Sequence, residues 1–184
     1  GVQIHGGMGF IDDAEISQVY RDARIGPIFE GTNYIQAQDL LGRKVMRDRG
    51  DTLRALLGDI ETAARELPQD PSQPLHRLRV GLIQGCSALR AASDRLVAAA
   101  ANEPELIGAV AWHFLQWLGV LAGAWQHALS ARSALATRGD AELARAMLDC
   151  AVFYSAHVLP RIHTHEAAVT AGAGPVTAAD PACL

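Results

Sequence analysis

The chain has 184 residues, of which 49% are apolar and 20% are charged, and its formal net charge is −4. A chain of this length buries roughly 70% of its unfolded surface, so its core needs no disulfide or metal to hold it together. Basic and acidic residues are spread evenly along the sequence, which argues against a nucleic-acid partner.

The three cysteines, Cys86, Cys150 and Cys183, are far apart and match no metal-ligand spacing. We therefore expect no metal site and a reducing, cytoplasmic compartment. The glycine-rich N-terminus lacks the basic and apolar regions of a signal peptide. The chain begins without methionine and inside an apparent motif, so we expect a piece of a longer protein.

The first fifty residues predict a glycine-rich loop followed by two helices. A capping box of Asp12 and Glu15 is expected to begin the first helix. That helix should end at Gly26-Pro27, because proline disfavours helix in the residue before it. Thr32 or Asn33 can cap the second helix, whose expected buried side carries Ile35, Leu40, Leu41 and Val45.

The sequence Arg49-Gly50-Asp51 breaks the helical pattern, so we predict two domains, at 1–50 and 51–184. The second domain should be helical almost throughout, with residues 173–184 frayed. Its expected helices cover about 52–66, 75–101, 105–137, 141–158 and 161–171. Four long helices with short connections predict an all-α fold built around an antiparallel helical bundle.

Residues 106–125 carry no formal charge and are long enough to span a bilayer. Trp112, Trp117 and Trp125 are spread through the stretch instead of marking its two ends, and no basic cluster flanks it. This pattern favours the buried central helix of a bundle, and we predict no membrane partner.

The histidines give no metal-ligand pattern. His163 and His165 are two residues apart, so a helix points them in different directions. His113, His127 and His157 have no ligand partner four residues away on their expected helices. We interpret all of these as packed or partly exposed side chains.

The most informative segment is Phe29-Glu30-Gly31-Thr32-Asn33, which places one carboxylate in a Gly-Thr turn between two amphipathic stretches. A lone Glu in a turn is most often simply exposed to solvent. Here the apolar neighbours Ile28 and Phe29 could instead desolvate the carboxylate and make it a stronger base.

Residues 3–45 resemble the flavin-dependent acyl-CoA dehydrogenases, in the order and spacing of that family's C-terminal helical domain. The motifs that carry the resemblance are Gln-Ile-His-Gly-Gly-Met-Gly-Phe from residue 3, Tyr-Arg-Asp-Ala-Arg-Ile from residue 20, and Ile-Phe-Glu-Gly-Thr-Asn from residue 28. Residues 51–184 resemble the extra C-terminal helical domain of the 3-methylmercaptopropionyl-CoA dehydrogenase branch.

The resemblance implies roles for named residues. Glu30 would be the catalytic base that takes the α-proton of an acyl-CoA while a hydride passes from the β-carbon to FAD. Its backbone N–H would polarise the thioester carbonyl, and Gly31 would line the acyl pocket. The FAD-contacting residues would be Thr32, Asn33 and Tyr34 and, toward FAD held by a neighbouring subunit, Gln3, Ile4, His5, Gly6 and Gly7.

The resemblance also implies partners and a limit. The complete enzyme would be a homo-oligomer that passes electrons to an electron-transfer flavoprotein. The family's N-terminal helical domain and middle β domain are not in this chain, so we expect it to be inactive alone. The alternative is a non-catalytic helical packing or oligomerisation module, whose apolar helix 105–137 packs in a bundle or at a subunit interface.

Overall fold

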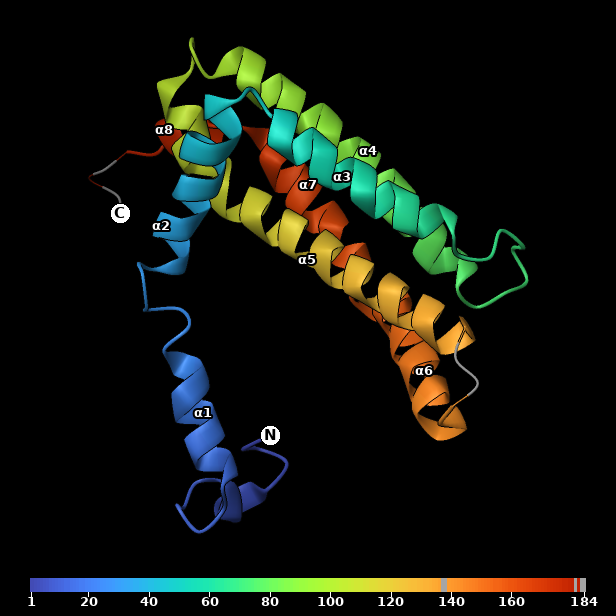
Figure 1. Ribbon diagram of the computed structural model, residues 1–184. Helices are drawn as coiled ribbons and strands as arrows, with labels where there is room; N and C mark the ends of the chain where they lie inside the picture. The colour runs from blue at the N-terminus through green and yellow to red at the C-terminus, as the bar shows by residue number, and fades with distance from the viewer. Residues whose placement is uncertain (137–138, 181, 183–184) are drawn as a thin grey trace. The chain divides into compact units, whose positions relative to one another are not determined.

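The computed structural model describes residues 1–136, 139–180 and 182. Within these residues every regular element is helical and no strand is present, which confirms the all-α fold (Figure 1). The chain forms two compact units, Gly1–Gln36 and Ala37–Leu184. The division of domains near residue 50 stays a prediction.

The first unit begins with the 3₁₀ helix η1 (Gly6–Gly9), followed by α1 (Ile16–Arg24). The predicted capping box is wrong, because no side chain caps α1. The Asp12 carboxylate instead accepts hydrogen bonds from Arg21 at 3.0 Å and from the Ser17 hydroxyl at 3.3 Å. A guanidinium is a stronger partner for a carboxylate than a backbone amide, so the side-chain contact replaces the cap. The predicted end of the helix, before Gly26-Pro27, is confirmed.

The second helix, α2, covers Asn33–Gln38. The Thr32 hydroxyl accepts a hydrogen bond from the Ile35 N–H at 3.4 Å, which confirms Thr32 as its cap. Helical structure then continues, but Asp39–Val45 (η2) is a π-helix and not an α-helix, and the predicted burial of Ile35 is wrong because its side chain is 55% exposed. The wider winding of η2 places Leu41 and Val45 almost one turn apart, and both are buried.

The second unit holds the long helices α3 (Asp51–Arg65), α4 (His76–Ala99), α5 (Pro104–Ala136) and α6 (Ala141–His157). It ends with η3 (Leu159–Arg161), α7 (Ile162–Ala171) and the single turn α8 (Gly174–Thr177). The expected fraying from residue 173 is therefore wrong for residues 174–177, which form the turn of α8, and Ala173 just before that turn is buried. Pro181, Cys183 and Leu184 lie outside the described residues.

Helix α5 is the centre of the second unit and contacts α3, α4, α6, α7 and η2 (Figure 1). Phe114 and Trp117 on this helix are almost completely buried. By length and composition alone, α5 is the one described helix that could cross a membrane. Its packing is that of the central bundle helix expected from the sequence.

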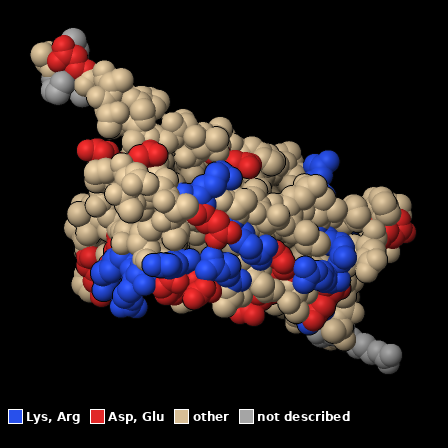
Figure 2. Space-filling model, turned by 90° about the horizontal axis from the view of Figure 1, so that it is seen from above, with Lys and Arg blue, Asp and Glu red and all other residues tan. Residues whose placement is uncertain are grey.

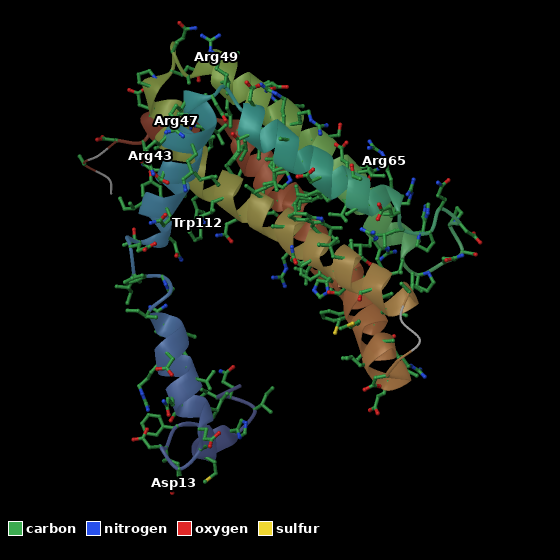
Figure 3. The ribbon with its side chains drawn as sticks, viewed as in Figure 1. Asp13, Arg43, Arg47, Arg49, Arg65 and Trp112 are labelled. Carbon is green, nitrogen blue, oxygen red and sulfur yellow. The ribbon has the colours of Figure 1, made fainter. Side chains whose placement is uncertain are left out.

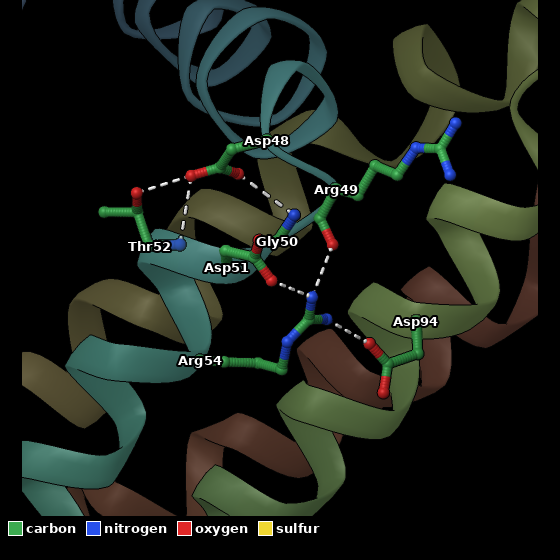
Figure 4. Close-up of polar contacts among 7 residues, drawn as sticks. All are labelled: Asp48, Arg49, Gly50, Asp51, Thr52, Arg54 and Asp94. Carbon is green, nitrogen blue, oxygen red and sulfur yellow. Dashed lines mark hydrogen bonds and ion pairs between the residues drawn. The ribbon is translucent and has the colours of Figure 1, made fainter.

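Charged contacts hold the start of α3 in place (Figure 4). The Asp48 carboxylate accepts hydrogen bonds from the backbone N–H groups of Gly50 and Thr52, both at 3.0 Å. The hydrogen bonds from Thr52 hold the pKa of Asp48 below its usual value. Arg54 binds Asp94 at 2.8 Å, which links α3 to α4.

The outer surface of the second unit carries mixed charges. On the face drawn in Figure 2, Lys and Arg side chains lie among Asp and Glu side chains instead of forming a patch of one sign. Glu61 is itself buried beneath this surface, and its carboxylate pairs with Arg65 at 3.1 Å and with Arg90 at 2.7 Å. Arg65 projects from α3 toward solvent (Figure 3).

Candidate functional site

The candidate site is the turn that joins α1 to α2. It begins where Pro27 prevents α1 from continuing. The Ile25 carbonyl accepts hydrogen bonds from the N–H groups of Ile28 at 3.0 Å and Phe29 at 2.8 Å. Gly31 then donates to the Ile28 carbonyl at 3.4 Å, so the backbone folds back before α2 begins.

Glu30 occupies an unusual backbone conformation. Its φ is +60°, and among the described non-glycine residues only Arg49 shares a positive φ. Such a conformation costs on the order of 1–3 kcal/mol and persists only when neighbouring contacts impose it. One such contact is the Gln36 side chain, which donates a hydrogen bond to the Glu30 carbonyl at 2.6 Å. Strained residues of this kind concentrate at functional sites.

Position 31 favours glycine for two reasons, its backbone conformation and the lack of space for a Cβ. Its φ is +112°, which is rare for a residue with a side chain. A Cβ at this position would also lie 3.1 Å from the Ile35 side chain. Gly31 and Thr32 therefore each have a local structural reason, because Thr32 caps the helix that follows, whereas the strained Glu30 has none.

The Glu30 side chain is exposed. Its apolar neighbours are exposed as well, Ile28 by 61% and Phe29 by 66%. The expected desolvation of the carboxylate by these neighbours is therefore wrong for this chain. The Glu30 backbone N–H has no hydrogen-bond acceptor among the described residues. The turn therefore exposes two groups of Glu30 to a binding partner, the side-chain carboxylate and the backbone N–H donor.

Three of the predicted flavin contacts follow Glu30 and Gly31 along the chain. Asn33 and Tyr34 are exposed on the first turn of α2, and Thr32 is exposed beside them. These three residues and Glu30 lie on one short stretch of backbone. The structure therefore brings this part of the predicted site together.

The N-terminal part of the predicted site lies elsewhere in the first unit. Gln3, Ile4, His5, Gly6 and Gly7 are all exposed, and a turn closed by the Gly1 carbonyl holds them. They precede α1, whereas Glu30 follows it, so the two groups lie at opposite ends of that helix (Figure 1). Nine helical residues span about 13 Å. The structure does not bring Gln3–Gly7 and Glu30 into one site.

Large apolar side chains of the first unit are unusually exposed. Phe10 is 84% and Ile4 is 90% exposed. Others that are more than half exposed are Met8, Val19, Tyr20, Ile25, Ile28, Phe29 and Ile35. An exposed apolar surface this extensive marks a region of interaction.

The second unit has features that the sequence did not indicate. A hollow of about 600 Å³ lies between the segment 68–75 and α6, lined by apolar residues that include Leu135, Leu148 and Val152. The Nδ1 atoms of His113 and His165 lie 3.3 Å apart, and both side chains are half-buried, as the interpretation of these histidines as packed or partly exposed predicts. No sequence spacing could reveal this pair, because 52 residues separate its members.

Comparison with known proteins gives two family matches. Residues 1–45 match the family described as acyl-CoA dehydrogenase, C-terminal domain. Residues 56–180 match the family described as acetyl-CoA dehydrogenase C-terminal like. Together they cover both the candidate site and the helical bundle.

Individual relatives agree with these matches. The chain is 42% identical to a 3-methylmercaptopropionyl-CoA dehydrogenase of Ruegeria pomeroyi over 92% of its own length and 29% of the relative. A broad-specificity linear acyl-CoA dehydrogenase of Mycobacterium tuberculosis is 47% identical over 33% of the chain and 10% of that protein. A caffeyl-CoA reductase-Etf complex subunit of Acetobacterium woodii is 44% identical over 22% of the chain and 11% of the subunit. The chain therefore spans less than a third of the length of these relatives.

Proposed function

Because this chain belongs to the acyl-CoA dehydrogenase family, we propose that it is the C-terminal part of an FAD-dependent enzyme that oxidises an acyl-CoA thioester. Glu30 is its catalytic base. The observation that carries the proposal is the strained Glu30, at φ +60°, in an exposed turn that leaves both its carboxylate and its backbone N–H available.

The turn supplies two groups that such an oxidation needs. The Glu30 carboxylate accepts the α-proton of the thioester, the work of a general base. The Glu30 N–H donates a hydrogen bond to the thioester oxygen, which stabilises the negative charge that forms there as the proton leaves. Gly31, without a side chain, leaves room for the acyl group beside the base. Bound FAD would accept the hydride from the β-carbon.

The residues assigned to FAD are suited to that contact. A Cβ on Gly6 or Gly7 would have no heavy atom within 4 Å, so the backbone there is open to close approach by a ligand. Thr32, Asn33 and Tyr34 are exposed beside Glu30. The family match supports a contact between the N-terminal group and FAD held by a neighbouring subunit of a homo-oligomer.

The remaining walls of the site belong to polypeptide outside these 184 residues. The exposed apolar side chains of the first unit and the greater length of the relatives support this proposal. An electron-transfer flavoprotein is the proposed electron acceptor, and the similarity to a caffeyl-CoA reductase-Etf complex subunit of Acetobacterium woodii supports it.

Replacement of the base in the complete enzyme tests the proposal. Glu30→Gln should leave FAD binding intact, because no charge that contacts FAD is removed. Flavin reduction by acyl-CoA, followed by loss of the flavin absorbance, should slow by about 10²–10⁴-fold, the usual contribution of a general base. Glu15→Gln is the matched control, because Glu15 is an exposed glutamate in the same unit with no capping role. Unimpaired reduction in Glu30→Gln would refute the assignment.

A second candidate is a non-catalytic helical packing module, favoured by the well-packed core of the second unit. The first candidate requires the other domains of an acyl-CoA dehydrogenase in the same polypeptide, and the second does not. The complete coding region therefore distinguishes them. Under either one, the 184-residue chain alone should neither retain FAD nor reduce a dye with acyl-CoA. A purified chain that stays yellow and turns over would contradict the expected inactivity.

A further inference from the structure

Gln36 of α2 reaches back along the chain to the residue proposed as the base. Its side-chain amide donates a hydrogen bond to the Glu30 backbone carbonyl at 2.6 Å, although six positions separate the two residues. A carbonyl oxygen only accepts hydrogen bonds, so the amide must present its NH₂ group there. Both residues belong to the first unit, and the bond closes the loop that leads from the end of α1 into α2 (Figure 1).

The helix holds this donor in place. The Gln36 backbone N–H donates to the Thr32 carbonyl at 3.0 Å, and the Thr32 hydroxyl accepts from the Ile35 N–H at the start of α2. Gln36 is half-buried, and its side chain passes close to Gly31. A Cβ at residue 31 would lie 3.5 Å from the amide nitrogen of Gln36. A helical residue therefore supplies a donor of defined position to the turn.

The acceptor belongs to the strained residue itself. Glu30 has a φ of +60°, and a residue with a side chain keeps such a conformation only when contacts impose it. Rotation about the N–Cα bond changes how the Glu30 carboxylate lies relative to its own N–H. The closed loop also carries Thr32, Asn33 and Tyr34, the proposed FAD contacts. One hydrogen bond therefore holds the base and these contacts in a single arrangement.

We propose that Gln36 is a positioning residue, whose hydrogen bond holds Glu30 at positive φ so that its carboxylate and N–H act on the same thioester. This inference rests on the function proposed for Glu30, and Gln36 acts through Glu30 without touching the substrate. A net hydrogen bond favours the conformation that it holds by about 2–13-fold. Without it, the strain turns Glu30 toward negative φ and moves the carboxylate away from the α-proton.

The first test measures the backbone and needs no activity. NMR of the 184-residue chain reports the φ of Glu30 through the coupling of its amide and α protons and through its carbon chemical shifts. Gln36→Met keeps the length of the side chain but removes the donor, so the φ of Glu30 should shift from positive toward negative. Gln18→Met is the matched control, because Gln18 is an exposed glutamine on α1. It should leave the φ of Glu30 unchanged.

The second test uses the complete enzyme and follows flavin reduction by acyl-CoA in a single turnover. Gln36→Met and the isosteric Gln36→Glu should slow reduction by about 10–100-fold, because proton transfer depends steeply on the position of the base. The Kd of acyl-CoA should change much less. The rate is counted per bound flavin, so unfolded molecules do not contribute and a merely structural role of Gln36 would leave it unchanged. Gln18→Met should react at the unsubstituted rate.

Glu30→Gln in the same assay separates this inference from the function on which it rests. Full-rate reduction in Glu30→Gln would refute Glu30 as the base. Slow reduction in Glu30→Gln together with full-rate reduction in both Gln36 variants would leave Glu30 as the base and overturn the role of Gln36. The same φ of Glu30 in Gln36→Met and in the unsubstituted chain would also overturn it, because other contacts would then impose the strain.

Discussion

Gly123 of α5 lies against Tyr154 of α6, and we predict that Gly123→Ala destabilises the helical unit. A Cβ at residue 123 would overlap the Tyr154 hydroxyl oxygen and lie 2.9 Å from its ring carbon Cζ. Tyr154 cannot easily move away, because its hydroxyl donates a hydrogen bond to the Val120 carbonyl at 3.1 Å and its ring contacts His127.

Opposing contributions determine the size of the effect. Replacing glycine by alanine inside a helix stabilises it by about 1 kcal/mol. Overpacking costs about 1–3 kcal/mol, and loss of the Tyr154 hydrogen bond costs about 1 kcal/mol more. The net free energy of unfolding should fall by about 1–3 kcal/mol, which for a chain of this size lowers Tm by about 2–12 °C.

Gly119→Ala is the matched control, because it makes the same substitution on α5 at a position where a Cβ meets no heavy atom within 4 Å. It should raise the unfolding free energy by about 1 kcal/mol. Urea and thermal unfolding followed by circular dichroism measure both variants. Tyr154→Phe should recover part of the loss in Gly123→Ala, because it removes the overlapping oxygen but keeps the ring. Equal stability of Gly119→Ala and Gly123→Ala would refute the close contact between α5 and α6.

Two further predictions concern titratable side chains. Burial raises the pKa of the Cys86 thiol to about 12, so at pH 8 only on the order of one molecule in ten thousand carries the reactive thiolate. Brief alkylation followed by mass spectrometry should therefore modify the exposed Cys150 and spare Cys86 until the chain unfolds, and equal labelling would contradict the buried position. The second prediction is a pH dependence from His165, whose pKa in the folded chain lies below its ordinary value of 6.5. The unfolded chain then binds the proton more readily, so this contribution to stability is complete above pH 6.5 and is lost as the pH falls through 6.5 toward the folded pKa. His165→Gln should reduce the change of the unfolding free energy with pH over that range, as measured by urea titrations. An unchanged pH profile would exclude the contribution of His165.

Local signals in the sequence were enough to place most helices. The predicted helix at 105–137 is observed at Pro104–Ala136, and the one at 141–158 is observed at Ala141–His157. Proline, glycine and capping residues act on their immediate neighbours, so their effect is readable without knowledge of the fold. Asp140 is an example, because its carboxylate accepts hydrogen bonds from the N–H groups of Glu142 and Leu143 at the start of α6.

The failures have a common cause. The capping box at Asp12 was wrong because Arg21, nine residues away, binds the same carboxylate. The π-helix η2 was not expected, because an apolar pattern compatible with an α-helix continues through it. In each case the sequence permitted one local arrangement. A long-range contact or a different helical winding, which no short motif encodes, replaced it.

The sequence by itself determined the motif that identifies the family and the Glu-Gly-Thr turn, because both depend on residues that are neighbours along the chain. Only the tertiary structure decided that Glu30 and its apolar neighbours are exposed and that His113 meets His165. Exposure and long-range pairing depend on how helices pack, and packing joins residues that the sequence keeps far apart.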